Sequence, residues 1–511
     1  MNRLFVLLLA ALIGFPVLSQ AQHLRGKCGF VENYAFMNRL KANKLTYLNY
    51  LGQNRGAVTY VPLNVVIGAT TNGAQTAADE SEVLEMVCKI NEDFASQDIQ
   101  FYIYEGISYF NNDAAYQDAG QVNPVLAEPF RKGDAIDLFI SQNPEGSSGL
   151  GGTTLGYYSP SDDWLVIRGS EVNGNSETTS HELGHYFSLA HPFRGWDCEE
   201  WDEDTHGVPL SSPVAPCQVF DNGAAVFVDA ELMDGSNCET AGDLLCDTPP
   251  DYNLGFGWPN CNYTGPCQDF NGTSLNPMET NMMGYFLGCT DFEFTPMQQA
   301  LIKADLEARA YLNTDFTPPA TDLDVANLSE PAEGTMLPYY TDILFVWDEI
   351  AGADRYLLEI DLSQNFNIAP IRLIVYGFAK YIDELSPNQT YYWRVKPFNS
   401  YQTCTAFSER GSFTTGTIVN TVEIGSISNW DIFPNPVQES QDLYVRLDMD
   451  QTTDVSINLL NINGAMIETQ QTTLIAGENN RTFSTAGLSQ GVYLVEVVSP
   501  TGKETKRVVI Q

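Results

Sequence analysis

The sequence predicts a multidomain chain in which an α/β domain with a mixed sheet is followed by two all-β sandwich domains. The 511 residues exceed what one hydrophobic core usually serves. Strand-like and helix-like segments alternate between residues 60 and 168, as in an α/β layer. After Thr314 helical periodicity disappears, and short strands rich in Tyr, Val and Trp alternate with turn residues.

The α/β domain is expected over residues 57–315. Its apolar patterns predict one helix at 79–94 and strands at 61–66, 99–104, 136–140 and 164–168. Residues 22–56 are polar and irregular, and we interpret them as a pro-segment. Residues 1–21 are typical of a signal peptide, because a short apolar run precedes the small residues Ser19 and Ala21.

Two β domains are expected after a Pro-containing linker at 316–319. In residues 326–415 the strand patterns around Trp347, at 356–360 and at 391–395 are spaced as in a seven-stranded sandwich. Residues 430–511 form a third, all-β segment with an apolar run at 455–460 and a turn at Asn463-Gly464.

Composition and cysteine usage indicate an exported protein. The 65 acidic residues outnumber the 25 basic ones and give a formal net charge of -40, which disfavours nucleic acid as a partner. Beyond the signal peptide no apolar stretch approaches the ~20 residues that a transmembrane helix needs. Ten cysteines, seven of them between Cys198 and Cys289, fit an oxidising export route. We therefore expect a secreted or cell-surface protein.

A zinc site is predicted at residues 181–191, where three of the five histidines fall. On a helix, His181 and His185 lie one turn apart on one face and can bind one Zn²⁺ ion. His191 completes the ligand set if the chain turns sharply after Phe187. Glu182 points about 100° away, so it suits the general base that takes a proton from a zinc-bound water. Three protein ligands leave a fourth position open, which is typical of a hydrolytic zinc site.

This segment resembles the long zinc motif of the metzincins, H-E-x-x-H-x-x-G-x-x-H. The family glycine is replaced by Ser188, which must adopt a left-handed turn at a cost of about 1 kcal/mol. The segment 281–285 resembles the family's methionine turn, which implies that Met283 lies beneath the metal. Tyr285 then corresponds to a tyrosine that stabilises the oxyanion. Ordinary core packing is the alternative for Met283.

Residues 60–312 resemble the pappalysin (cytophagalysin) branch of the metzincins, through Gly242 to Pro249 and Cys289 to Gln298. The resemblance implies a Cys261–Cys289 disulfide and a zymogen in which Cys28 blocks the zinc. A Cys28–Cys88 disulfide is the alternative for Cys28. The other pairings, among Cys198, Cys217, Cys238, Cys246 and Cys267, stay open.

The same branch binds structural Ca²⁺, which makes Asp243, Asp247 and Thr248 candidate ligands with hard oxygen donors. A solvated acidic loop is the alternative for these residues. The acidic run from Asp197 to Asp204 is expected to be only solvated. Arginine-preferring relatives carry acidic residues where this chain has Phe286-Leu287-Gly288, so an apolar primed-side pocket is expected.

Residues 326–415 resemble a fibronectin type III domain, whose role would be attachment to a substrate or surface, or spacing. Residues 430–511 resemble the C-terminal sorting domain of type IX secretion, through Phe433-Pro434-Asn435-Pro436, Asn463-Gly464 and 491–493. That resemblance implies the secretion machinery as a partner. A second binding sandwich is the alternative.

These features together predict a secreted zinc endopeptidase that hydrolyses extracellular proteins or peptides. The substrate is expected to lie extended along an edge strand at 164–168. The alternative is a surface adhesin whose protease-like domain only binds, which the two β domains and Ser188 favour.

Overall fold

The computed structural model describes residues 26–52, 56–144, 153–256, 258–318, 322–368, 370–417, 426–462, 465–499 and 502–511. The expected signal peptide and the Asn463-Gly464 turn lie outside the described residues. The chain divides into two compact units, Met1–Ala78 with Lys89–Thr314, and Asp79–Cys88 with Asp315–Gln511. Among the residues described, no helix is long and apolar enough to cross a membrane.

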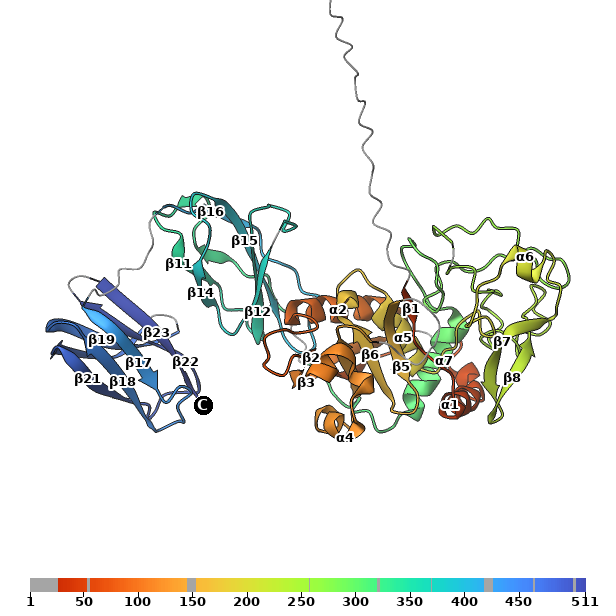
Figure 1. The fold of residues 1–511 in the computed structure, drawn as a ribbon, viewed down its shortest axis with the longest axis horizontal. Helices are drawn as coiled ribbons and strands as arrows, with labels where there is room; N and C mark the ends of the chain where they lie inside the picture. The colour runs from red at the N-terminus through yellow and green to blue at the C-terminus, as the bar shows by residue number, and fades with distance from the viewer. Residues whose placement is uncertain are drawn as a thin grey trace, which may run out of the picture. The chain divides into compact units, whose positions relative to one another are not determined.

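A six-stranded mixed sheet forms the centre of the first unit (Figure 1). Only the β5–β6 pair is antiparallel; all other neighbours are parallel. This confirms the predicted mixed sheet, and each of the four predicted strands lies within an observed one. In spatial order the strands are β1 (Gly26–Cys28), β5 (Thr153–Ser159), β6 (Trp164–Arg168), β4 (Ile136–Ser141), β2 (Thr59–Ala69) and β3 (Ile99–Asn111).

The expectation that residues 164–168 form an edge strand is wrong. β6 lies between β5 and β4, and β5 is the strand toward that edge, where the N-terminal β1 pairs with it. The sequence of β5, TTLGYYS, lacks apolar alternation and therefore gave no strand signal.

Helices and one hairpin complete the first unit. The predicted helix at 79–94 is confirmed as α2 (Glu80–Asp93), whose residues up to Cys88 are assigned to the second unit. Further helices are α3 (Asp113–Asp118), α4 (Pro124–Ala127), α5 (Thr178–Tyr186), α6 (Glu203–His206) and α7 (Pro296–Ala308). The short 3₁₀ turns are η1 (Tyr47–Asn49), η2 (Ala95–Gln97), η3 (Ala119–Gln121), η4 (Glu128–Phe130) and η5 (Gly169–Glu171). β7 (Val214–Asp221) and β8 (Ala224–Asp229) form an antiparallel hairpin.

The expectation that residues 22–56 are irregular is wrong, because this stretch contains helix α1 (Tyr34–Lys44) as well as β1. The Asn33 side chain accepts a hydrogen bond from the Phe36 N–H and caps the helix. Phe36 and Leu40, one turn apart, are fully buried. The proposed pro-segment is therefore a folded part of the first unit.

A buried charged network fixes the C-terminal end of α5. Arg309 donates to the Tyr186 carbonyl, pairs with Asp305, and reaches both carboxylate oxygens of Asp163 at 3.0 and 3.1 Å. Burial alone would raise the pKa of Asp163, but Arg309, Tyr158 and other partners outweigh it and lower that pKa to about 2.

Asp163→Asn should lower the free energy of unfolding by about 2 kcal/mol near neutral pH. Asparagine tolerates the positive φ of this position, 57°, so only the charge is lost. Because the folded-state pKa is lowered, the carboxylate stabilises the fold above about pH 4 and loses this effect as pH falls through about 2. Denaturation of both proteins between pH 2 and pH 6 should show the difference shrinking below pH 4; a constant difference would contradict this role.

Two separate sandwich cores lie in the second unit. The first has one strand more than the expected seven among its described residues, because the two-residue β10 counts separately. Its sheets are β10 (Thr335–Met336), β16 (Gly411–Thr414), β15 (Thr390–Phe398), β12 (Arg355–Asp361) and β13 (Ile371–Val375), facing β14 (Ala379–Glu384), β11 (Thr341–Trp347) and β9 (Leu328–Glu330). Trp347 and Trp393 are buried at its centre.

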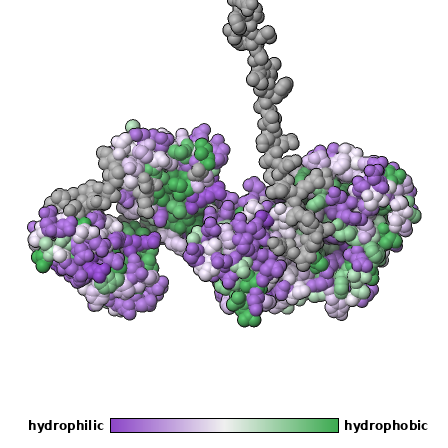
Figure 2. Space-filling view, in the orientation of Figure 1, coloured by the Kyte–Doolittle hydropathy of each residue, from purple (hydrophilic) through white to green (hydrophobic). Residues whose placement is uncertain are grey.

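The C-terminal sandwich begins at Ile427 and has a core of aliphatic residues with Trp430 and Phe483. The face of this sandwich that Figure 2 shows is mostly hydrophilic. Strand β20 also exposes polar residues, among them Glu468 and Thr469. The sheets are β17 (Ile427–Phe433), β18 (Asp442–Met449) and β21 (Gly477–Ser484), and β20 (Met466–Leu474), β19 (Thr453–Asn461), β22 (Gly491–Ser499) and β23 (Gly502–Ile510).

Candidate metal centre and active site

Helix α5 presents His181 and His185 from a buried position. Every residue of the helix from Thr179 to Tyr186 is buried, and both histidines are at most 7% exposed. A helix that carried histidines on its surface by coincidence would leave them in water. The two imidazoles instead point into the interior of the first unit, one turn apart.

A sharp turn after the helix brings His191 back to the same place. Ser188 adopts the left-handed conformation that the sequence requires, with φ of 67°. Its hydroxyl donates to Asp305 Oδ1 at 2.5 Å. This buried hydrogen bond offsets the strain of a residue with a side chain at a glycine position.

The Nε2 atoms of the three histidines converge on one point. His191 Nε2 lies 3.2 Å from His181 Nε2 and 3.0 Å from His185 Nε2. Together with the Cys28 sulfur these ligand atoms lie within 4.8 Å of one another. Three imidazoles and one sulfur are a donor set that zinc prefers.

The other ring nitrogen of each histidine is held by an acceptor. His181 Nδ1 lies 2.8 Å from the Met282 carbonyl, and His185 Nδ1 lies 2.7 Å from the Leu189 carbonyl. His191 Nδ1 lies 2.6 Å from Asp197 Oδ1. Such partners keep the proton on Nδ1 and leave Nε2 free for a metal. Burial and the neighbouring His191 also lower the pKa of His181 to about 3, so its ring is neutral.

The expectation that Asp197 is only solvated is wrong. Its carboxylate orients His191 and also accepts the Gly195 N–H. A lone aspartate six residues after a histidine has no distinctive spacing, so only the folded geometry reveals this contact.

Glu182 and Tyr285 lie beside the histidine cluster, and neither belongs to the cluster of four ligand residues. Glu182 is fully buried, and among the described residues its Oε1 has no hydrogen-bond partner. Burial raises the pKa of Glu182 to about 8. The Tyr285 hydroxyl lies 3.5 Å from His191 Nε2 and accepts the Cys28 N–H at 3.2 Å. A base and a hydroxyl therefore flank the same point.

Met283 packs directly against the zinc helix. It is fully buried, and a Cβ added at Gly184 would lie 2.3 Å from its sulfur. The turn is held because the Asn281 side chain accepts the Met283 N–H. The glycine between His181 and His185 is thus needed for the close approach of the methionine.

Cys28 is a free, buried thiol that faces the cluster. Its sulfur donates to Glu182 Oε2 at 3.3 Å and accepts the Phe30 N–H. The alternative Cys28–Cys88 disulfide is wrong, because Cys88 pairs with Cys404. The Phe30 ring stacks on His185 with centroids 4.0 Å apart, so the N-terminal segment covers the histidines.

Three further disulfides lie in the first unit, and one is Cys261–Cys289. The pairings that the sequence left open are Cys198–Cys217 and Cys238–Cys246, while Cys267 is free and buried.

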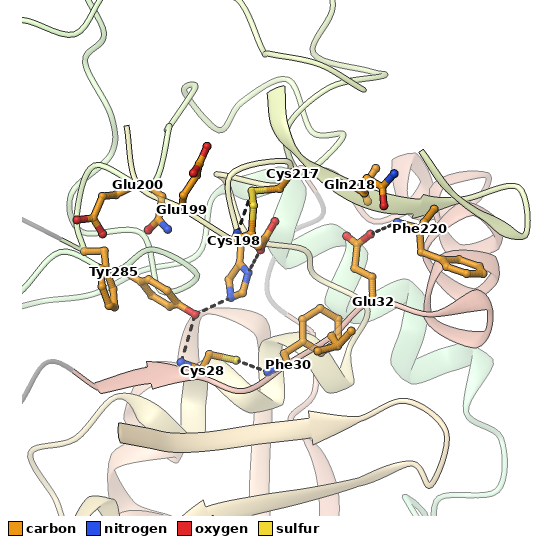
Figure 3. A pocket seen from close by; sticks show the side chains of 17 residues that line it. Cys28, Phe30, Glu32, Cys198, Glu199, Glu200, Cys217, Gln218, Phe220 and Tyr285 are labelled. Carbon is orange, nitrogen blue, oxygen red and sulfur yellow. Dashed lines mark hydrogen bonds and ion pairs between the residues drawn. A yellow bond between two sulfur atoms is a disulfide. The ribbon is translucent and has the colours of Figure 1, made fainter. Parts of the chain in front are cut away.

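A cleft of about 870 Å³ opens beside His191 and Tyr285. Residues of the N-terminal segment, among them Cys28 and Glu32, form one wall (Figure 3). The hairpin residues Gln218 to Phe220 form the opposite wall, and Glu199 and Glu200 lie at the rim.

The three candidate calcium ligands are placed differently. Asp243 is 1% exposed, and its Oδ2 and the Thr248 hydroxyl lack a well-formed hydrogen bond to any described residue. Asp247 instead caps helix α7, accepting from the Thr295 hydroxyl and the Met297 N–H. Sequence reasoning missed Glu231, whose carboxylate lies so close to Gly242 that a Cβ there would be 1.9 Å from it.

Two parts of this chain are similar to known proteins. The family described as secretion system C-terminal sorting domain matches residues 431–511. An extracellular metalloprotease of Pyricularia oryzae is 25% identical over 269 residues, which are 49% of this chain and 75% of that protein. One from Arthroderma gypseum is 23% identical and covers 55% of this chain and 84% of its own length.

These findings support a secreted metalloprotease. They place the protein outside the cell or at its surface. Among solved structures, Tannerella forsythia promirolysin mutant E225A aligns with a TM-score of 0.36 and 15% identity, over 57% of this chain and 99% of that one. Chicken CNTN1 FN1-FN3 domains align with a TM-score of 0.17 and 13% identity, over 38% of this chain and 70% of that one.

Proposed function

We propose that this chain is the zymogen of a secreted zinc endopeptidase of the pappalysin branch of the metzincins. The convergence of three histidine Nε2 atoms, each with its Nδ1 held by an acceptor, carries the proposal. The metalloprotease relatives and the buried Glu182 beside the cluster support it.

His181, His185 and His191 would hold a zinc ion, which would polarise the scissile carbonyl and lower the pKa of a water so that it can attack near neutral pH. Glu182 takes the proton of the attacking water and passes it to the leaving amine. The Tyr285 hydroxyl donates a hydrogen bond to the oxyanion that develops on the carbonyl oxygen. The substrate pairs with β5, the strand that β1 covers in the zymogen.

A peptidase assay with and without a chelator tests the function. After removal of its pro-segment, the protein should cleave casein or gelatin. It should lose this activity when a chelator removes the metal and regain it when Zn²⁺ is added. Binding of protein without cleavage under any of these conditions would favour the adhesin.

A structural calcium ion is part of the proposal, with Glu231, Asp243 and Thr248 as ligands. Asp243 Oδ2 and the Thr248 hydroxyl lack a well-formed hydrogen bond to any described residue, and this exclusively oxygen donor set fits Ca²⁺. Burial also raises the pKa of Glu231 to about 10, so ionising this carboxyl near neutral pH requires a positive charge nearby.

Removal of calcium should therefore lower the Tm of the first unit. At a free Ca²⁺ concentration 100 times its Kd, a bound ion stabilises the folded state by about 2.7 kcal/mol. A calcium-selective chelator should abolish this stabilisation. Glu231→Gln should make Tm insensitive to calcium. An equal calcium response in the wild type and in this variant would remove Glu231 from the ligand set.

The two β domains would serve attachment and export. We propose a fibronectin type III-like domain at 326–415 and a type IX sorting domain at 430–511, the latter supported by the family match to 431–511. Deletion of residues 430–511 should trap the protein in the cell envelope, measured by immunoblots of medium and cell fractions. Export of the shortened chain at the normal level would refute the sorting role.

A further inference from the structure

A buried arginine, Arg194, lies three residues after His191 and holds a carboxylate of the N-terminal segment. The Arg194 side chain is 2% exposed, and its Nε donates to Glu32 Oε1 at 2.6 Å. Its Nη2 lies 3.4 Å from the Phe220 carbonyl. The second oxygen of Glu32 accepts the Phe220 N–H at 3.3 Å. Both donors to this carboxylate belong to the part of the chain that remains after the pro-segment leaves.

The Glu32 end of this contact lies in the cleft that His191 also lines, and the buried Arg194 lies behind it without lining the cleft. Glu32 and Phe220 both line the cleft, and Figure 3 shows the Glu32 carboxylate directed at the Phe220 backbone. Glu32 is only four residues from Cys28, whose sulfur faces the histidines. A side chain at this place is therefore within a few residues of the point where a substrate would be cut.

Departure of the pro-segment removes the carboxylate partner of a buried guanidinium, which is costly unless another replaces it. Asp197 is engaged by His191 and by the Gly195 N–H. Asp221 pairs with Lys41 of the pro-segment, and it is the neighbouring acid that maturation releases. A substrate carboxylate entering the cleft would meet the same two donors as Glu32 does.

We propose that Arg194 and the Phe220 N–H form a substrate subsite for an acidic side chain, and that Glu32 occupies this subsite in the zymogen. The proposal rests on the peptidase function and names its substrate class: peptides with Asp or Glu a few residues from the cleaved bond. This subsite is separate from the apolar pocket expected around Phe286.

The subsite formed by Arg194 and the Phe220 N–H is expected to act mainly by rejecting substrates that lack an acidic side chain at this position. Burial raises the pKa of Glu32 although Arg194 acts to lower it, so the pairing offsets only part of the desolvation cost. A glutamine or lysine at the same place leaves the buried guanidinium without a negative partner. Sites that hydrogen-bond or charge-pair one side chain reject its unpaired analogue strongly, so we expect at least a tenfold preference for Glu over Gln.

Peptides that differ in a single residue test the subsite on the unmodified enzyme. A series should place Glu, Gln or Lys at each position within five residues of the cut bond, with kcat/KM measured on the matured full chain. The expected result is a preference of about tenfold or more for Glu over Gln at one position, and rejection of Lys there. Cleavage of all peptides with equal kcat/KM would overturn the subsite while leaving the peptidase function intact; cleavage of none would overturn the peptidase function itself.

Variants assign the preference to the arginine. Arg194→Gln should abolish the Glu preference. Lys132→Gln is the control: it removes a positive charge that pairs with Glu105 and does not line the cleft, so it should keep the preference. Persistence of the preference in Arg194→Gln would overturn the assignment. The wild type and Asp221→Asn should both prefer Glu. A Glu preference that appears only in Asp221→Asn would show that Asp221 pairs with Arg194 in the mature enzyme, and would also overturn the assignment.

A synthetic pro-segment peptide tests the Glu32–Arg194 pairing by inhibition of the mature enzyme and not by its cleavage preference. A peptide covering residues 26–52 should inhibit the mature enzyme about tenfold better than its Glu32→Gln form. In Arg194→Gln enzyme the two peptides should inhibit equally, as a double-mutant cycle requires. An unchanged ratio of the two inhibition constants would contradict a direct Glu32–Arg194 pairing.

Discussion

Glu182→Ala should abolish peptide cleavage and leave the zinc in place. The carboxylate is buried beside the cluster, and its free oxygen is available to an attacking water. A positioned general base contributes on the order of 10²–10⁴ in rate, and this base also delivers the proton to the leaving group, so we expect the upper end of that range. Because Glu182 is outside the group of ligand residues, the variant should retain the metal content of the parent.

The measurement is kcat/KM on a fluorogenic peptide, with metal analysis of the same sample. Glu177→Ala is a matched control, since it removes an equal charge just before the same helix without facing the histidines. Its activity should stay close to that of the parent. Cleavage by Glu182→Ala at the parental rate would contradict the mechanism, and loss of zinc would show that Glu182 holds the metal.

Cys28→Ala should yield a chain that cleaves small peptides while its pro-segment is still attached. The thiol is the fourth member of the histidine cluster and donates to Glu182, so it blocks the metal and the base together. Each loss of about 1.4 kcal/mol of blocking interaction raises the ratio of unblocked to blocked sites tenfold. A bond between the Cys28 sulfur and zinc contributes more than that amount. The initial cleavage rate should therefore rise at least about tenfold over the intact wild-type zymogen.

Intact length must be verified on gels at each time point, because self-processing would produce the same activity. Cys267→Ala is the matched control, since it removes the other free buried thiol. It should leave latency unchanged. Equal latency of Cys28→Ala and the wild type would show that Phe30 and the rest of the segment suffice to block the cleft.

Local sequence patterns predicted the parts of the site that are close in the chain. Two histidines four residues apart must share a helix face, and a third one six residues later can return to it only through a turn at Ser188. The positive φ of Ser188 confirms that requirement. Buried strands were readable for a similar reason, because runs such as Trp164 to Ile167 carry a continuous apolar signal.

Contacts between distant segments could not be read in the same way. Asp305 supports Ser188 from 117 residues away, and Glu32 meets Arg194 across 162 residues. β5 pairs with β1 through backbone groups, which leave little trace in the side-chain pattern. Helix α1 was missed although Phe36 and Leu40 have helical spacing, because its polar residues dominate the segment.

Zinc analysis of the purified full chain tests the three-histidine centre most directly. A single zinc ion per chain is predicted in the wild type, and its loss is predicted in His185→Gln, whose unchanged circular dichroism would show that the fold persists. Folded wild-type protein without zinc, or an unchanged zinc content in His185→Gln, would contradict the centre described above.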